Sequence, residues 1–407
     1  MPDADTRGTP LLMLVGVTAL GPLALNIFLP SMPRMEAVFD TSYGVIHLTL
    51  SLYLAALACS QLVYGPLSDR FGRRPVLLSG LALYIAGALI CLAAGSVTML
   101  IVGRVVQAVG GCAGLVIGRA MVRDQFGRDE AASKIATITM VMVLAPMVAP
   151  LIGGQLDIMA GWRSVFGFVL AVGVLVAGLA FVFVRETIRV RQPFVSPTGL
   201  VPVYARLLGN RAYRGYAFQT MFTAATFYTF VGGAPYLLQT VMGLNPMGYA
   251  FWFIGAAACY MAGNFTSARL ARAWGVDRLI ALGTAILVLG ALAHVAFALA
   301  GVLTPLAFMV PMYVMTYANG LCIPTGTAAS ISVDPTRAGA ASGLSGFLQM
   351  GFGALASFVV GHLLQDDQWP FVVMLVICSL LATAAHWYGQ RGAKVAERID
   401  EAPTIAE

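Results

Sequence analysis

The sequence predicts an all-α integral membrane protein with twelve transmembrane helices in two bundles of six. Hydrophobic residues make up 59% of its 407 residues and charged residues only 10%, whereas a soluble domain carries about 25% charged residues. The apolar residues fall into runs of about 20, the length that a helix needs to cross a bilayer core of about 30 Å. These runs lack the alternating pattern of membrane β-strands, so helices are the form that satisfies their backbone groups.

Twelve such runs follow one another along the chain, separated by short polar stretches. The predicted spans cover residues 11–33, 44–66, 76–95, 98–118, 135–156, 162–184, 214–239, 248–268, 279–300, 304–329, 338–362 and 370–389. All six cysteines lie inside these runs without a CxxC pair. We therefore interpret them as packing residues and expect no metal site and no cofactor.

The basic residues predict the orientation. If both termini are cytoplasmic, twenty of the 24 Lys and Arg residues lie in inner loops and tails, and only Arg34 and Arg163 lie in outer loops. This bias is the positive-inside rule. A basic patch on one exposed face, as in a nucleic-acid-binding protein, is not indicated.

The longest polar stretch, residues 185–213, divides the chain in the middle. It separates a predicted N-terminal six-helix bundle, residues 1–184, from a C-terminal bundle and tail, residues 214–407. The stretch "LSDRFGRRP" after the second span has a weak echo in "LARAWGVDRL" after the eighth. Two six-helix halves joined by a basic loop are typical of transporters whose halves rock about a midplane site.

Several motifs carry a resemblance to a known family. "GPLSDRFGRRP" (65–75) resembles the signature loop of the major facilitator superfamily, and Arg104-x-x-Gln107-x-x-Gly110-Gly111 resembles its fourth-helix motif. "LAPMVAPLIGG" (144–154) resembles the fifth-helix motif of its drug antiporters, while "NIFLPSMP" (26–33) and "SGFLQMGFGALAS" (345–357) resemble the Bcr/CflA drug-resistance group. The resemblance implies a monomeric exporter of small amphiphilic drugs, phenicol-like antibiotics among them. It also implies alternating access, proton antiport and a bacterial-type inner membrane.

Other classes fit less well. The four histidines lie in four different spans or span ends without an HExxH pair, so an enzyme is not expected. No GxxxxGK[ST] motif for an ATP-driven pump is present. Within the transporters, a proton-independent facilitator or an importer of a neutral or anionic small solute is the alternative. A transporter-like sensor or scaffold is the alternative outside them.

Two segments predict a gate. In the loop after the second span the gating candidates are Gly65, Asp69, Arg70, Gly72 and Arg73. The glycines would let helix ends approach closely, and Asp69 would pair with an arginine and accept hydrogen bonds from a helix N-terminus. Alternatively, the arginines only follow the positive-inside rule. In the fifth span, Pro146, Pro150 and Gly154 predict a helix that bends or packs closely, and these two interpretations are not separable.

The predicted substrate cavity centres on Arg104. An arginine near the centre of a span costs at least about 2.5 to 3.5 kcal/mol. Arg104 shares one helical face with Gln107, Gly111 and Gly114, which we expect to face the cavity; the alternative is that Arg104 reaches a membrane surface. The other cavity candidates are Asn26, Tyr53, Phe227, Tyr228, Phe230 and Tyr236. The aromatic residues of the seventh span could instead form an interfacial belt.

The residue that would carry a proton is not obvious from the sequence, because Asn26 stands where the Bcr/CflA group usually has Asp. All 18 acidic residues fall in loops, tails or span ends. The candidates for the proton carrier are therefore His47, which titrates near neutral pH and could face Asn26, and Asp69 or Asp124 at the inner gate. The alternative is that His47 is an interfacial histidine and that the chain has lost proton coupling.

Overall fold

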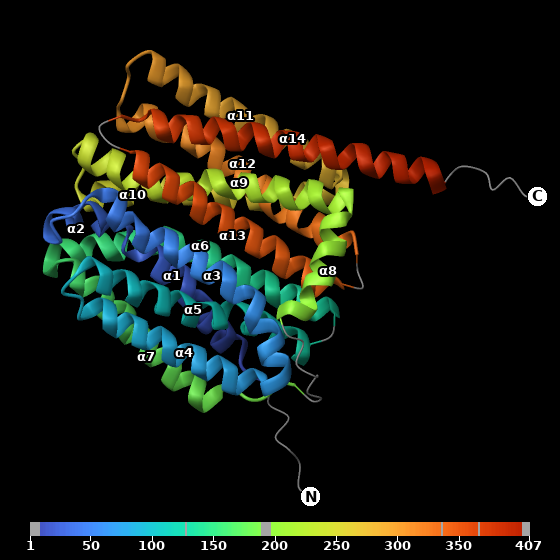
Figure 1. Ribbon diagram of the computed structural model, residues 1–407, viewed down its shortest axis with the longest axis horizontal. Helices are drawn as coiled ribbons and strands as arrows, with labels where there is room; N and C mark the ends of the chain where they lie inside the picture. Colours follow the sequence, from blue (N-terminus) through green and yellow to red (C-terminus); the bar gives the residue numbers. More distant parts are fainter. Residues whose placement is uncertain (1–8, 127, 189–196, 335–336, 365–366, 401–407) are drawn as a thin grey trace, which may run out of the picture. The chain divides into compact units, whose positions relative to one another are not determined.

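The structure, a computed structural model, describes residues 9–126, 128–188, 197–334, 337–364 and 367–400. It is built of helices, and no strand occurs in these ranges (Figure 1). The chain divides into two compact units. Unit 1 comprises Met1–Pro197 with Ala234–Ala257, and unit 2 comprises Thr198–Gly233 with Ala258–Glu407.

Unit 1 contains the first seven α-helices. They are α1 (Leu11–Ile27), α2 (Met32–Val38), α3 (Tyr43–Phe71), α4 (Arg73–Leu92), α5 (Val97–Gln125), α6 (Arg128–Ala160) and α7 (Trp162–Phe183). A short 3-10 helix, η1 (Leu29–Ser31), joins α1 to α2.

The remaining helices belong wholly or mostly to unit 2. They are α8 (Pro197–Gly209), α9 (Arg211–Pro235), α10 (Pro246–Trp274), α11 (Val276–Leu299), α12 (Pro305–Ser332), α13 (Ala338–Leu363) and α14 (Trp369–Asp400). The end of α9, the π-helix η2 (Tyr236–Val241) and the beginning of α10 group with unit 1. We call this part the 234–257 segment. No local pattern in the sequence predicts that it groups with unit 1.

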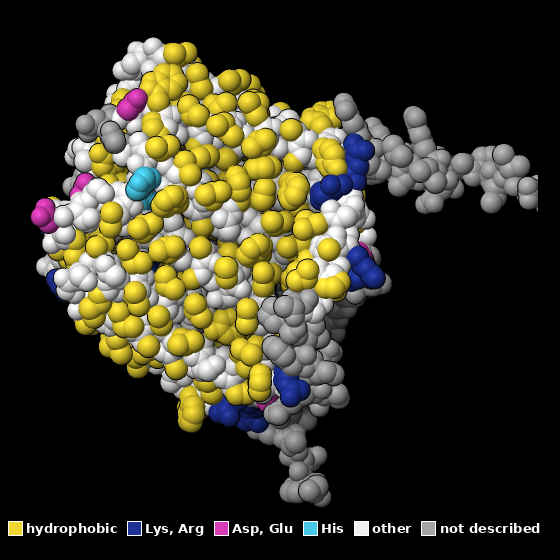
Figure 2. Space-filling model, viewed as in Figure 1, with side chains coloured by type: hydrophobic (Ala, Val, Ile, Leu, Met, Phe, Trp, Pro, Cys, Tyr) yellow, Lys and Arg dark blue, Asp and Glu magenta, His cyan; other side chains and the backbone are white. Residues whose placement is uncertain are grey.

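Nine helical segments in the described part of the chain are long and apolar enough to cross a membrane. Three predicted spans, 135–156, 214–239 and 248–268, fall on α6, α9 and α10, which are not among these nine. In α9 the apolar character is diluted by Gln219 and a series of buried threonines. Figure 2 shows hydrophobic side chains over most of the visible face, with Lys and Arg at its edges. The count of twelve spans and the cytoplasmic termini stay predictions.

Two segments differ from the sequence-based expectation. The first predicted span, 11–33, is not one helix, because α1 ends at Ile27 and η1 begins at Leu29. Pro30 and Pro33 explain the break, since each lacks the backbone N–H that a continuous helix needs. The predicted central loop, 185–213, contains the helix α8. The predicted domain boundaries are otherwise untested.

Glycines hold α4 and α5 close together. A Cβ atom added at Gly110 of α5 would overlap the backbone nitrogen of Tyr84 in α4, and one added at Gly87 of α4 would overlap that of Gln107 in α5. In a bilayer, where burial of apolar surface drives helices together only weakly, such close backbone packing is a main source of association. The contact also fixes the position of Gln107.

We therefore expect Gly110→Val to lower the melting temperature of the protein in detergent. The added side chain would have to push α4 and α5 apart, and overpacking of this kind costs about 1 to 3 kcal/mol. Gly178→Val is the matched control, because Gly178 in α7 has no atom within 4 Å of an added Cβ. Equal melting temperatures for the two variants would contradict the packing account.

Candidate functional site

Arg104 lies in the third turn of α5 and is 1% exposed. Its Nη1 donates hydrogen bonds to the Ala24 carbonyl oxygen of α1 at 2.9 Å and to Gln107 Oε1 at 2.7 Å. The rings of Phe28 and Tyr53 each lie with their centres 4.1 Å from Arg104 Cζ. Cation–π contacts on two rings therefore replace part of the solvation that the guanidinium loses.

The sequence positions both rings. Phe28 lies in the break between α1 and η1, so the interruption of the first helix brings its ring to Arg104. Tyr53 comes from α3, and its hydroxyl donates to the Gly21 carbonyl oxygen at 3.1 Å. Arg104, Gln107, Phe28, Tyr53 and Ala24 are called the Arg104 site below.

The polar atoms that remain at the Arg104 site are all donors. Arg104 Nε and Nη2 and Gln107 Nε2 are buried without a hydrogen-bond partner among the described residues. The orientation of the Gln107 amide follows from Arg104, because a guanidinium N–H requires the amide oxygen and leaves the NH₂ group for another acceptor. No described carboxylate forms an ion pair with Arg104. The site is thus suited to a group that accepts hydrogen bonds.

The small-residue face that continues from Arg104 does not line an open space. A Cβ added at Gly114 would overlap the Val17 carbonyl oxygen of α1, and one added at Gly111 would lie 3.3 Å from Gly21 Cα. The expectation that this whole face lines the cavity is therefore wrong for its glycines. They bring α5 close enough to α1 for Arg104 to reach the Ala24 carbonyl oxygen.

The aromatic residues predicted for the seventh span are divided between the units. Phe227 and Tyr228 lie in unit 2, where Phe227 packs against Tyr260 at 6.1 Å between ring centres. Phe230, also in unit 2, is fully buried. Tyr236 lies in unit 1, where its ring centre is 4.7 Å from that of Tyr43.

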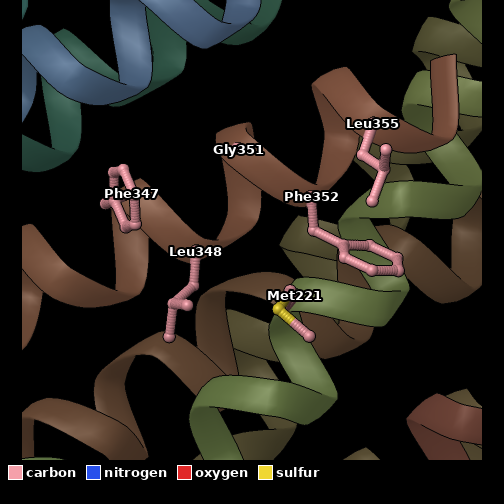
Figure 3. Close-up of a pocket in the computed structure, with 6 residues that line it drawn as sticks. All are labelled: Met221, Phe347, Leu348, Gly351, Phe352 and Leu355. Carbon is pink, nitrogen blue, oxygen red and sulfur yellow. The ribbon is translucent and has the colours of Figure 1, made fainter. Parts of the chain in front are cut away.

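Unit 2 has an apolar groove of about 320 Å³ between α9 and α13. Figure 3 shows Met221 of α9 opposite side chains from α13. The lining residues are Met221, Phe347, Leu348, Gly351, Phe352 and Leu355. The groove was not predicted from the sequence, because its residues look like ordinary membrane-spanning side chains.

Arg73 organises a charged cluster at the junction of α3 and α4. Its Nη1 lies 2.5 Å from Asp69 and 2.6 Å from Ser68 Oγ, and its Nε lies 2.9 Å from Asp124 at the end of α5. Asp124 also accepts a hydrogen bond from Thr187 Oγ1 at 3.0 Å. The structure thus brings together two predicted proton carriers, Asp69 and Asp124, through one predicted gate residue.

Glu186 completes this cluster and was not predicted. Its carboxylate accepts hydrogen bonds from the backbone nitrogens of Arg73 at 2.9 Å and Arg74 at 3.2 Å. It therefore caps the N-terminus of α4, the role expected for Asp69. A signal existed in the sequence, since α4 begins with Gly72, Arg73 and Arg74 and has no acidic or capping side chain of its own. We call Arg73, Asp69, Asp124, Ser68 and Glu186 the Arg73 cluster.

The two loop glycines differ. Gly72 has a φ of +102°, and a Cβ there would overlap Glu186 Oε2, so glycine is required. The close approach expected at Gly65 is not present, since no atom lies within 4 Å of an added Cβ. Arg70 is exposed and lies over the Phe71 ring at 5.9 Å, outside the Arg73 cluster.

The fifth-span residues lie in α6. Pro150 and Gly154 are buried, and an added Cβ at Gly154 would be 3.1 Å from the Pro246 carbonyl oxygen of the 234–257 segment. The side chain of Pro146 lies outside the described part of the structure. α6 has no break at Pro150, so this residue does not end the helix.

Asn26 and His47 are both buried in unit 1. Asn26 Nδ2 donates to the Pro22 carbonyl oxygen at 2.8 Å, and its Oδ1 has no hydrogen-bond partner in the described residues. His47 Nδ1 lies 3.1 Å from Ser51 Oγ, and its ring centre lies 5.8 Å from that of Tyr43. Each of these contacts joins residues of the same helix. The proposed pairing of Asn26 with His47 therefore stays a prediction.

Comparisons with solved structures agree with this architecture. A bacterial homologue of the human lysosomal transporter Spinster, inward-facing and unoccupied, matches with a TM-score of 0.69 at 16% identity, over 97% of this chain and 98% of that one. A mutant form of the nucleoside transporter NupG matches with a TM-score of 0.71 at 11% identity, over 94% of this chain and 98% of that one. At these identities the likeness shows the fold alone.

Sequence comparisons identify relatives. Multidrug resistance protein D of Escherichia coli is 30% identical over 372 residues, 91% of this chain and 93% of its own length. The chloramphenicol resistance protein of Pseudomonas aeruginosa is 29% identical over 391 residues, 91% of this chain and 88% of its own length. An uncharacterized MFS-type transporter, YdgK of Bacillus subtilis, is 30% identical over 86% of this chain and 88% of its own length.

The family model of the Major Facilitator Superfamily matches residues 14–358. This match and the relatives confirm the family predicted from the sequence motifs and with it a transporter rather than an enzyme. The chain is a multi-pass membrane protein that belongs to the Major Facilitator Superfamily, among relatives that are drug-resistance transporters.

Proposed function

We propose that the protein exports small amphiphilic drugs, phenicol-like antibiotics among them, by alternating access in exchange for protons. The observation that carries the proposal is the Arg104 site, a buried cation with free donor groups between aromatic rings. It suits a compact molecule with an apolar body and hydrogen-bond acceptors. The names of the relatives, multidrug resistance protein D and chloramphenicol resistance protein, support the drug class.

The apolar groove of unit 2 supports the same substrate class. A space of about 320 Å³ is at the lower end of the range for small-molecule pockets, about 300 to 1,000 Å³. Its apolar lining would bind rings and alkyl groups with little chemical selectivity. Such a surface agrees with a transporter of several drugs that share shape and hydrophobicity.

The Arg73 cluster is the proposed inner gate, on the side that the positive-inside rule assigns to the cytoplasm. Asp69 and Asp124 keep 40% and 24% of their side chains exposed. Arg73 itself is buried, but the carboxylates remain in contact with water, which weakens each ion pair. The cluster can therefore hold one state of the cycle and still release it at each turnover.

The 234–257 segment is the proposed outer closure. It packs on unit 1 through Gly154 against Pro246 and through Tyr43 against Tyr236. The π-helix η2 lies in this segment, and such turns are frequent at functional sites in helices. In the proposed cycle the segment leaves unit 1 when the outer side opens.

A proton-independent facilitator or importer is the second candidate. The observation that favours it is Asn26, an amide in a position where a titratable group is usual in the group that the sequence resembles. In either case we propose a monomer in the inner membrane, with the drug, protons and lipid as its partners.

The proposed function predicts drug resistance in bacterial cells that lack their own exporters. Expression of the chain should lower the steady-state accumulation of chloramphenicol, and collapse of the proton gradient should restore it to the level in cells with an empty vector. A well-expressed protein that leaves accumulation of chloramphenicol and of a panel of amphiphilic antibiotics unchanged would contradict drug export. Expression that only equalises chloramphenicol across the membrane, with or without the gradient, would favour the second candidate.

Arg104→Lys is predicted to lower chloramphenicol export about tenfold or more, and Arg104→Ala to abolish it. Lysine keeps the charge but not the planar group that lies between Phe28 and Tyr53, and a buried cation–π contact is worth about 2 kcal/mol. The measurement compares the rates of chloramphenicol export by cells that express wild type and each variant at equal levels. Arg269→Lys is the control, because Arg269 lies over Phe265 at 4.2 Å on the exposed surface. Full activity of Arg104→Lys would show that charge alone suffices.

Substitution of the gate carboxylates is predicted to slow turnover without weakening drug binding. Asp69→Asn and Asp124→Asn each remove one ion pair of Arg73, which perturbs the gate and not the Arg104 site. Chloramphenicol binding to purified protein and export by cells measure the two effects separately. Asp334→Asn is the control, since Asp334 pairs with Arg337 at 2.7 Å in unit 2. Unimpaired export by both gate variants would refute the gate assignment.

A further inference from the structure

One acidic side chain in the described part of the chain is buried, and it is Asp157 of α6, at 1% exposure. The sequence places it just beyond the predicted span 135–156 and therefore in an outer loop. In the structure α6 continues to Ala160, and the carboxylate lies beneath the surface of unit 1. An ionised carboxylate in such a place is stable only if a positive charge or hydrogen bonds compensate it.

The compensating charge is Arg34 of α2. Arg34 Nη1 lies 3.1 Å from Asp157 Oδ2 and 3.3 Å from the Asp157 carbonyl oxygen. The two partners differ in burial, because the Arg34 side chain is 55% exposed. Arg34 can therefore turn into solvent at little cost, whereas Asp157 cannot follow it.

Few other charges act on this carboxylate. α1 and η1 carry no ionisable side chain, and the ionisable residues of α5 lie near Arg104 or toward its C-terminus. On α2, Glu36 accepts a hydrogen bond from the Tyr43 backbone nitrogen, and on α7, Arg163 donates to the Ala94 carbonyl oxygen. The 234–257 segment contributes only the phenols of Tyr236 and Tyr249. The state of Asp157 thus depends mainly on Arg34.

The position of Asp157 connects it to the proposed outer closure. Gly153, one helical turn earlier, lies so close to α1 that an added Cβ would overlap the Ile27 carbonyl oxygen. Gly154, beside it, contacts Pro246 of the 234–257 segment. A departure of this segment would remove a contact of α6 within one turn of the Arg34–Asp157 pair.

We propose that Asp157 is the proton-binding site of this transporter and that its proton and the Arg34 guanidinium replace each other as the outer end opens and closes. With Arg34 in place, Asp157 is ionised. When the pair breaks, the buried carboxylate takes up a proton from the outer side, because an unpaired buried charge costs several kcal/mol. The proposal rests on the proton antiport proposed above and supplies the carboxylate that Asn26 does not.

The first test measures protonation and does not depend on transport. Infrared difference spectra of the purified protein over a pH titration should contain a carboxylic-acid band that Asp157→Asn removes. Arg34→Gln should move this band to higher pH by about one unit or more, because a neighbouring positive charge favours the ionised form. A titration that is the same in wild type and Asp157→Asn would overturn the proposal, as would an unchanged midpoint in Arg34→Gln.

The second test measures coupling in proteoliposomes with chloramphenicol as the probe. Asp157→Asn should lower the number of protons moved per chloramphenicol at least about tenfold, and Asp40→Asn should leave it unchanged. Asp40 is a suitable control because it is exposed at the same end of unit 1, and asparagine tolerates its φ of 48°. Loss of coupling in His47→Gln but not in Asp157→Asn would overturn the proposal in favour of His47. If wild type moves no chloramphenicol, the proposed function fails. The infrared titration would still show whether Asp157 binds a proton and whether Arg34 controls this binding.

Discussion

A guanidinium buried inside an apolar bundle, with no carboxylate paired to it among the described residues, is the constraint on which unit 1 depends. Arg104 is tolerated because a backbone carbonyl of α1, the Gln107 amide and the faces of Phe28 and Tyr53 surround it. Each of these groups is positioned by a particular feature of the fold. The glycines of α5 bring α1 close, the break after Ile27 places Phe28, and the contact between Gly87 and Gln107 fixes the amide. Three hydrogen-bond donors, Arg104 Nε, Arg104 Nη2 and Gln107 Nε2, remain without a partner among the described residues. We therefore propose that the Arg104 site recognises the substrate.

The ion pairs of unit 1 differ from Arg104, because each lies at a helix end and joins a buried partner to a more exposed one. Arg73 holds two partly exposed carboxylates, and Arg34 holds a buried one from an exposed position. The exposed partner can move into water when the neighbouring backbone moves, and the buried partner then needs another group or a proton to compensate its charge. In the proposed cycle, pairs of this kind form and break at the two ends of unit 1, while Arg104 keeps its charge throughout. The Arg73 cluster and the Arg34–Asp157 pair supply these ion pairs.

The sequence predicted what depends on composition and local spacing. Long apolar helices, the family, and the proximity of Arg104 and Gln107 follow from hydropathy, motifs and helical periodicity. It did not predict what depends on packing between distant segments. Glu186 lies 113 residues after Arg73, the first residue of the helix that it caps, and Asp157 looks like a loop residue until α6 is seen to continue past it. The grouping of the 234–257 segment with unit 1 likewise depends on backbone contacts that no local pattern encodes.

In the proposed cycle the energy of a proton gradient moves a drug through this chain. The most direct measurement is uptake of chloramphenicol by proteoliposomes of the purified protein with an acidic interior. Chloramphenicol has no basic amine, so the pH difference alone does not trap it. Accumulation above the external concentration, lost when the gradient is collapsed, is the predicted result. Equal internal and external concentrations with the gradient intact would contradict the account.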